Sequence, residues 1–338
     1  MLLIATALAA CSGDSFTGVN SEPDLSRRRI KDTPLPPPPP PVTTPDTPNL
    51  LSGAMLWVDP YSNARKTADA WRVTRPADAT QMDKVAAGAQ ARWIGNWNTN
   101  VQADVDAATT TITNAGAMPI FVAYNIPQRD CGGLSGGNAT TADVYRNWII
   151  AFANGIGTRR ATVILEPDAL AAMDCLTSTD QQMRLDLLSY AVQTLHAKGG
   201  IAVYLDAGHP AWKSASTMAS RLTSAGIALA QGFSLNVSNF RSTSDNVTYG
   251  QQIASLTGKH FIVDTGRNGL GPTADSQWCN PGGRALGDRP TTLTGIANVD
   301  AFLWIKTPGE SDGACSGAPA AGAWMPEYAL GLAQRASF

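Results

Sequence analysis

Short apolar runs, each followed by polar residues, recur along the chain. The run at residues 161–165, Ala-Thr-Val-Ile-Leu, has the length and composition of a strand buried on both faces. Pro167 cannot continue a hydrogen-bonded ladder, so the strand should stop there and leave Asp168 just beyond its carboxyl end. Further runs of this kind occupy residues 121–126, 201–206, 233–236, 261–264 and 302–306. Residues 56–60 and 91–97 are expected to form two earlier strands.

Helical patterns separate these runs. We expect a helical region that starts at residues 63–70, and helices at residues 101–115, 142–156, 180–198, 214–225 and 247–256. Gly199 and Gly200 follow one of them, as glycines commonly follow the end of a helix. Regular alternation of strand and helix predicts an α/β protein with a parallel β/α barrel, whose reactive groups gather at the carboxyl ends of the strands.

Length and charge narrow the possible functions. The chain has 338 residues, 43% of them hydrophobic, and a formal charge of −2. This length accommodates one large domain with a substantial core plus a tail. A charge near zero gives no basic face for nucleic acid, so we expect no nucleic-acid partner.

The first 49 residues differ in character from the rest. Residues 1–11 resemble a bacterial lipoprotein signal that ends at a lipidated Cys11, although no Lys or Arg precedes the apolar stretch. An ordinary cleaved signal with an incidental cysteine is the alternative. Residues 12–49 should form a disordered linker, stiffened by the proline run at residues 36–41. The arginines at residues 27–29 suit either a solvated tether or a contact with an anionic surface. We therefore expect an exported protein held at the cell envelope only by its lipid, with a catalytic domain at residues 50–338.

The remaining cysteines point to disulfides. Without Cys11 the count is four, and an even count in an exported chain suggests two disulfides with three possible pairings. We favour Cys131–Cys175 and Cys279–Cys315, because each would join neighbouring loops on the same face. The cysteines lack zinc-ligand spacing and the chain has only three histidines, so we expect neither a metal nor a cofactor.

Two other chemistries fit poorly. Residues 133–137 match the Gly-x-Ser-x-Gly pattern around Ser135, but neither a strand before it nor a helix after it forms the required elbow. A phosphate-binding loop would need a glycine-rich turn that leads into a Lys-Ser/Thr helix start, and the chain has none.

Carboxylates at several strand ends fit better. Asp130, Asp168, Asp206, Glu310 and Asp312 should converge on one face. Such groups cannot all ionise together, so one of them is kept neutral and can act as an acid. Cleavage of a glycosidic bond needs such an acid and a second group that activates water. Taken singly, any of these residues could instead cap a loop or form a salt bridge.

Five segments together resemble glycoside hydrolase family 6, the inverting cellulases, over residues from about 50 to the C-terminus. They are Glu-Pro-Asp at 166–168, Tyr-Leu-Asp-Ala-Gly-His at 204–209, Asn-Ile-Pro-Gln-Arg-Asp-Cys at 125–131, Trp-Cys-Asn-Pro at 278–281 and the segment 304–313. The resemblance implies a distorted, TIM-like barrel of about seven strands, with the active-site cleft at the carboxyl ends of the strands. It also implies a β-1,4-glucan polysaccharide or oligosaccharide as partner, and we expect a monomer.

The resemblance assigns roles to residues. Asp168 would be the general acid, Asp130 would keep it protonated and order water, and Asp312 is the candidate base. Asp206 would have a structural and electrostatic role, paired with Arg129 or Arg267. The other matching positions would contact sugar, by crowding it (Tyr124), by stacking (Trp93, Trp212 and Trp278) or by polar contacts (Arg129, His209, Ser238, Asn239, Lys306 and Glu310).

Several assignments have structural alternatives. Trp93 could belong to the core, Trp212 could pack on a helix, His209 could bond loop backbone, and Lys306 could form a salt bridge at the barrel end. The loops at residues 131–145 and 312–324 are too short to roof a glucan chain, which favours endo over exo action within the family. A carbohydrate-binding lipoprotein without turnover and a structural envelope protein remain alternatives from other classes.

Overall fold

The computed structural model describes residues 48–134, 136 and 139–338. The expected signal, Cys11, nearly all of the linker and Ser135 lie outside these residues. Seven parallel strands form one curled sheet in the order β1 to β7, as the barrel prediction requires. The strands are β1 (Arg92–Gly95), β2 (Ile120–Tyr124), β3 (Ala161–Leu165), β4 (Ile201–Asp206), β5 (Gly232–Leu235), β6 (His260–Asp264) and β7 (Val299–Leu303).

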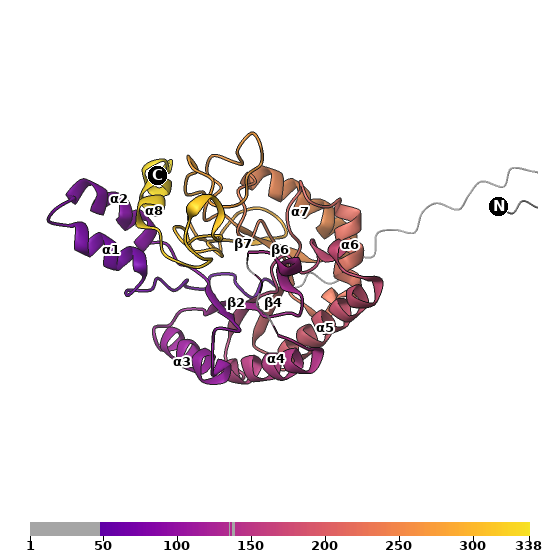
Figure 1. The fold of residues 1–338 in the computed structure, drawn as a ribbon. Helices are drawn as coiled ribbons and strands as arrows, with labels where there is room; N and C mark the ends of the chain where they lie inside the picture. Colours follow the sequence, from indigo (N-terminus) through magenta and orange to yellow (C-terminus); the bar gives the residue numbers. More distant parts are fainter. Residues whose placement is uncertain (1–47, 135, 137–138) are drawn as a thin grey trace, which may run out of the picture. The chain divides into compact units, whose positions relative to one another are not determined.

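Eight α-helices accompany the sheet within the described ranges. They are α1 (Asn63–Trp71), α2 (Pro76–Ala86), α3 (Val101–Asn114), α4 (Ala142–Ile156), α5 (Ser178–His196), α6 (Ala215–Ser224), α7 (Thr243–Thr257) and α8 (Pro326–Gln334). Helices α3 to α7 follow one another around the outside of the sheet (Figure 1). Side chains of Thr141 and Thr177 accept hydrogen bonds from the first turns of α4 and α5, which fixes where these two helices begin.

The two faces of each strand enter different cores. On β3, Val163 and Leu165 belong to the core between sheet and outer helices, whereas Ile164 lies in the core inside the curled sheet. Tyr204 of β4 and Ile262 of β6 share that inner core. Because both faces are buried, the strands read as continuous apolar runs rather than as alternating patterns.

The sheet is barely closed between β7 and β1. A single bridge joins Gln90 to Trp304, where the Ala91 N–H donates to the Trp304 carbonyl at 3.0 Å. Trp304 is itself buried in a third core with residues of α1, α2 and α8, and these three helices lie together in Figure 1. The barrel is therefore distorted at one seam, next to the first and last strands.

Three expectations about elements need correction. Residues 56–60 form no strand: only Leu56 makes a bridge, to Met118, and Pro60 has no N–H to extend the pairing. Strand β7 spans Val299–Leu303 rather than residues 302–306. Helices α2 and α8 were not predicted, although a proline at the first position of each is a recognised start signal.

No helix among the described residues is long and apolar enough to cross a membrane.

Candidate active site

A cleft of about 1220 Å³ lies at the carboxyl ends of the strands. Most of the residues predicted from the sequence line it together: Trp93, Tyr124, Arg129, Asp130, Asp168, His209, Trp212, Ser238, Asn239, Trp278, Lys306, Glu310 and Asp312. The two exceptions, Asp206 and Arg267, are buried and do not line the cleft. The topology thus gathers side chains from strand ends that are far apart in sequence.

Asp168 lies just beyond β3, after the proline that ends the strand. Its backbone has φ of 69°, in the left-handed region that is uncommon for residues other than glycine. Burial raises the pKa of Asp168 well above its usual range, and the neighbouring carboxylates of Asp206, Asp130 and Asp312 raise it further. A carboxyl group in this setting keeps its proton to higher pH than an ordinary aspartic acid, and it can donate that proton.

Asp206 lies at the end of β4 and its carboxylate accepts hydrogen bonds from its surroundings. Its Oδ1 accepts from the Asp168 N–H at 2.9 Å and the Gly208 N–H at 3.1 Å, and its Oδ2 accepts from the Ser234 hydroxyl at 3.2 Å. Burial raises the pKa of Asp206 to about 6, although the two backbone bonds oppose the shift.

The expected ion pair of Asp206 with Arg129 or Arg267 is wrong. In the part of the chain that the structure describes, backbone N–H groups and Ser234 take the place of an arginine partner. Arg267 pairs with Asp312 instead, at 2.8 Å. Sequence spacing could not distinguish the two aspartates as partners, because both follow strands at the same end of the sheet.

Asp130 lies in a tight turn, Arg129–Gly132, within the loop that follows β2. Asp130 and Cys131 both have positive φ, at 54° and 48°. The disulfide Cys131–Cys175, with Cα atoms 6.2 Å apart, joins this turn to the loop after β3. The guanidinium of Arg129 lies 4.1 Å from the ring centre of Tyr124 and donates to its carbonyl oxygen. Burial and the charge of Asp168 raise the pKa of Tyr124, so its phenol remains protonated.

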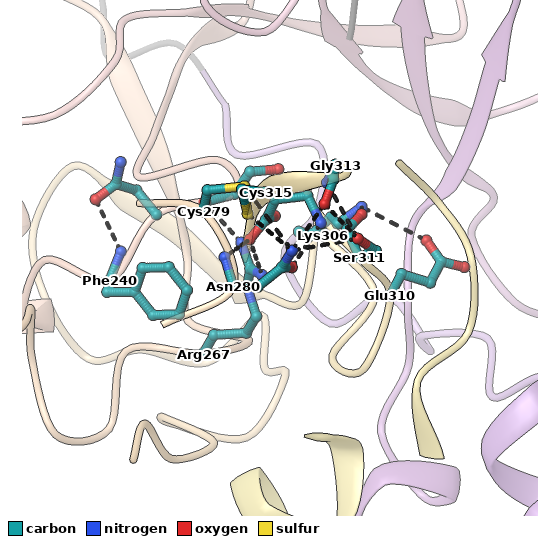
Figure 2. A network of polar contacts seen from close by, with 12 residues as sticks. Phe240, Arg267, Cys279, Asn280, Lys306, Glu310, Ser311, Gly313 and Cys315 are labelled. Atoms are coloured by element: carbon teal, nitrogen blue, oxygen red, sulfur yellow. Dashed lines mark hydrogen bonds and ion pairs between the residues drawn. A yellow bond between two sulfur atoms is a disulfide. The ribbon is translucent and has the colours of Figure 1, made fainter. Parts of the chain in front are cut away.

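Asp312 is held from two sides. Its Oδ2 accepts from Arg267 at 2.8 Å and from the Asn280 N–H at 3.0 Å, while its own N–H donates to Asn280 Oδ1 at 2.8 Å. Asn280 adjoins the second predicted disulfide, Cys279–Cys315, whose Cα atoms are 6.4 Å apart. Figure 2 shows Arg267 and Asn280 beside this disulfide. Both predicted pairings are therefore present.

Lys306 and Glu310 form a second charged group in the cleft. Their side-chain atoms Nζ and Oε2 lie 3.8 Å apart, and Lys306 Nζ also donates to the Ser311 carbonyl at 3.2 Å (Figure 2). The Lys306 ammonium lies 5.8 Å from the ring centre of Trp93. Lys306 thus forms the salt bridge that was considered as the alternative to a sugar contact, and it also lines the cleft.

Tryptophan rings lie at the cleft surface. Trp93 is half-buried, with its indole N–H donating to the Ile305 carbonyl at 2.8 Å, so it serves core and cleft at once. Trp212 and Trp278 are 38% and 51% exposed, which leaves ring surface for a ligand. His209 packs 5.4 Å from Trp212, and burial lowers the pKa of His209 to about 4, so its ring is neutral.

The structure adds residues that the sequence reasoning missed. Trp57, Tyr61, Trp97 and Trp324 also line the cleft. Trp57 and Trp97 were both assigned to expected strands, at residues 56–60 and 91–97. Strand β1 ends at Gly95, so Trp97 follows it in the way that other cleft residues follow their strands. Among the residues that the structure describes, no group of three or more His, Cys, Asp or Glu side chains is arranged to hold a metal ion.

Comparisons with known proteins agree with this geometry. Endoglucanase A of Cellulomonas fimi is 45% identical over 284 residues, which cover 83% of this chain and 61% of that protein. The solved endoglucanase Cel6 of Mycobacterium tuberculosis, in complex with a methyl-cellobiosyl-thio-cellobioside, is 47% identical with a TM-score of 0.80. The match covers 85% of this chain and 99% of that one. The cellobiohydrolase Cel6A core of Chaetomium thermophilum is 28% identical with a TM-score of 0.75, over 85% and 98% of the two chains.

The sequence model described as Glycosyl hydrolases family 6 matches residues 51–336, nearly the whole described part of the chain. The resemblance seen in the sequence motifs is confirmed, and so is the distorted barrel that it implies. This chain belongs to the glycosyl hydrolases of family 6.

Proposed function

We propose that the protein hydrolyses internal β-1,4-glucosidic bonds in cellulose or related β-glucans, with inversion at the anomeric carbon. The observation that carries this proposal is the setting of Asp168, a carboxyl group with a raised pKa among three other aspartates in a tryptophan-lined cleft. The relatives named endoglucanase, and the cellobioside bound to the Mycobacterium enzyme, support this substrate class.

The cleft surface complements a β-1,4-glucan. Such a chain presents C–H groups on its ring faces and hydroxyl groups around its edges. Exposed indole rings of Trp212 and Trp278 suit the faces. Charged groups such as Lys306 and Glu310 suit the hydroxyls, since hydrogen bonds with an ionised partner are the stronger ones.

In the proposed reaction Asp168 protonates the leaving glycosidic oxygen as the bond to the anomeric carbon breaks. A water molecule attacks that carbon from the opposite face, and its proton passes toward Asp130 or Asp312. Arg267 and Asn280 hold the Asp312 side chain in place by hydrogen bonds to its Oδ2, which keeps this possible proton acceptor fixed in the cleft. Asp206 acts indirectly: its carboxylate accepts a hydrogen bond from the Asp168 N–H and so helps to hold the backbone of Asp168 in place.

Endo action is favoured by the open surface of the cleft. Trp97, Trp212 and Trp278 are 52%, 38% and 51% exposed, whereas rings inside a roofed tunnel would be covered.

One observation favours an exo-acting cellobiohydrolase as a second candidate: Leu134 packs against Gly313, so the two flanking loops meet at one point. Viscosity loss per reducing end on a soluble substituted cellulose separates the two, because an endo enzyme gives a steep early fall and an exo enzyme a shallow one.

The acid and the stereochemistry have separate tests. Asp168→Asn should abolish hydrolysis of unactivated cello-oligosaccharides while the thermal unfolding temperature stays close to wild type. Full activity in that variant would remove Asp168 from the mechanism. Proton NMR during hydrolysis should show the α-anomer first, and an initial β-anomer would contradict direct attack by water.

Export with a lipid on Cys11 is also part of the proposal. The two disulfides support an oxidising compartment. Labelling with a fatty-acid analogue should mark the wild-type protein but not a Cys11→Ser variant. Equal labelling of both would exclude Cys11 as the lipidation site.

A further inference from the structure

Arg184 of α5 is an arginine placed almost entirely inside the protein. It is 2% exposed, and a buried guanidinium usually pairs with a carboxylate. Within the described ranges, Arg184 instead directs its N–H groups at three backbone carbonyls. Its Nη1 donates to Ala169 at 3.2 Å, and its Nη2 donates to Pro127 at 2.8 Å and to Gln128 at 2.9 Å.

These carbonyls belong to the two loops that carry Asp130 and Asp168. Ala169 follows Asp168 directly, and Gln128 precedes Asp130 by two residues. The planar guanidinium therefore links the loop after β2 to the loop after β3 through their backbone carbonyls, inside the protein. The Cys131–Cys175 disulfide links the same two loops covalently. Arginine suits this bridging role better than lysine, because its planar guanidinium presents several N–H donors in fixed directions whereas the lysine ammonium is a compact point charge on a flexible chain.

Both loops have backbone conformations that need such support. Gln128, Asp130 and Asp168 have φ values of 55°, 54° and 69°. Non-glycine residues in this region are strained, so they persist only where the surroundings determine them. Arg184 bonds the carbonyl of one strained residue, Gln128, and the carbonyl next to another, Asp168.

Glu166 acts on the same loop from the other side. Its buried carboxylate accepts from the Asn125 N–H at 3.0 and 2.9 Å and from the Ile126 N–H at 3.0 Å. Burial lowers the pKa of Arg184, and the nearby carboxylate of Glu166 opposes that shift. Residues 125–128 are thus bonded at their N–H groups by Glu166 and at their carbonyls by Arg184.

We propose that Arg184 is a positioning residue that fixes Asp130 relative to Asp168 by bonding the loops on which they lie. The inference rests on the proposed function, in which Asp168 is the acid. Arg184 acts only through the two loops, since it lies beneath them and does not line the cleft. If the loop after β2 moves outward, Asp130 repels the ionised form of Asp168 less. The acid then loses its proton at lower pH.

Arg184→Met tests the proposal, with Arg184→Lys as a second variant and Arg159→Met as the matched control. Arg159 also donates to backbone carbonyls, those of Gly155 and Ile156, but these precede β3 at the opposite end of the sheet. In Arg184→Met we expect kcat on cellopentaose to fall about tenfold to a hundredfold, the range for small misplacements of reacting groups, with KM nearly unchanged. The alkaline limb of the pH profile should move to lower pH. Arg184→Lys should recover part of kcat, and Arg159→Met should keep both kcat and the pH profile.

Hydrogen exchange gives a readout that does not depend on turnover. Amides of residues 125–134 and 166–172 should exchange faster in both Arg184 variants than in the wild type or in Arg159→Met. A folded Arg184→Met protein with wild-type kcat, pH profile and exchange would overturn the proposal. If that variant does not fold, an unchanged Arg184→Lys would overturn it equally. An inactive wild type would contradict the proposed function alone, and exchange of the two loops would still decide the role of Arg184.

Discussion

Replacing Asp206 by asparagine tests the electrostatic basis of the active site. The side chains have the same shape, and the asparagine oxygen can accept the same bonds from the N–H groups of Asp168 and Gly208. The amide nitrogen can donate to the Ser234 hydroxyl, which is able to accept. Asp206→Asn therefore removes one buried negative charge and keeps all three contacts as hydrogen bonds, with donor and acceptor exchanged in the contact with Ser234.

The expected shift follows from Coulomb's law. Two like charges roughly 6 Å apart, at an effective dielectric constant of about 20, repel by about 3 kcal/mol, or about two pKa units. Asp206 is the first of the charged neighbours that raise the pKa of Asp168, so this pKa should fall in the variant. Activity needs protonated Asp168 and is lost as pH rises through its pKa. The alkaline limb of kcat/KM on cellopentaose should therefore move about one to two units toward lower pH.

The same substitution should stabilise the fold at alkaline pH. The pKa of Asp206 is raised to about 6 in the folded protein. A carboxyl with a raised pKa contributes stability at pH below its unfolded value, and this contribution is lost as pH rises through the folded value. At about pH 8, removal of the ionised group should raise the free energy of unfolding by up to about 3 kcal/mol, measured by urea titration.

The control is Asp186→Asn, which changes an exposed aspartate on α5. It should alter neither the pH profile nor the stability. An alkaline limb that stays in place in Asp206→Asn would refute the reasoning, because it would show that neighbouring charge does not govern the protonation of Asp168.

Other positions give distinct expectations. Trp278→Ala should raise KM for long cello-oligosaccharides about threefold to tenfold, because one aromatic contact is lost. Initial rates over a range of chain lengths would show this, and an unchanged KM would exclude stacking on Trp278. Replacing Cys279 and Cys315 by serine opens a 36-residue loop and should lower the free energy of unfolding by about 4 kcal/mol. Chemical denaturation would measure this loss, and equal stability of the variant and the wild type would contradict it. Tyr204→Phe removes a buried hydroxyl that donates to Asp300 at 2.6 Å, away from the cleft. It should cost about 1–3 kcal/mol of stability with kcat unchanged, and a large loss of kcat would contradict that separation.

Much of the fold was readable from local pattern. The apolar runs before Pro167 and before Ala207 mark β3 and β4 within one residue, and α4 begins and ends where its periodicity predicts. Such patterns depend on neighbours in sequence, which is why they could be read without the structure. The segment at residues 56–60 failed for the same reason: its composition suits a strand, but it finds a partner only at Leu56.

The partners of the charged residues could not be predicted in this way. Arg267 lies 45 residues from Asp312, and the choice of Asp312 over Asp206 depends on which loops the curled sheet brings together. The bridging position of Arg184 was also invisible, because nothing in α5 marks that side chain as facing two loops.

The sequence by itself determined the alternation of strands and helices, the acidic residues placed after the strands, and cysteines that could be paired correctly. These features are local or follow from the common direction of parallel strands. Only the tertiary structure decided which arginine neutralises which aspartate, which tryptophans share one cleft, and how the strained loops of Asp130 and Asp168 are held together. Those outcomes depend on distances between side chains from distant parts of the chain, and such distances are fixed only when the sheet curls and its outer helices pack.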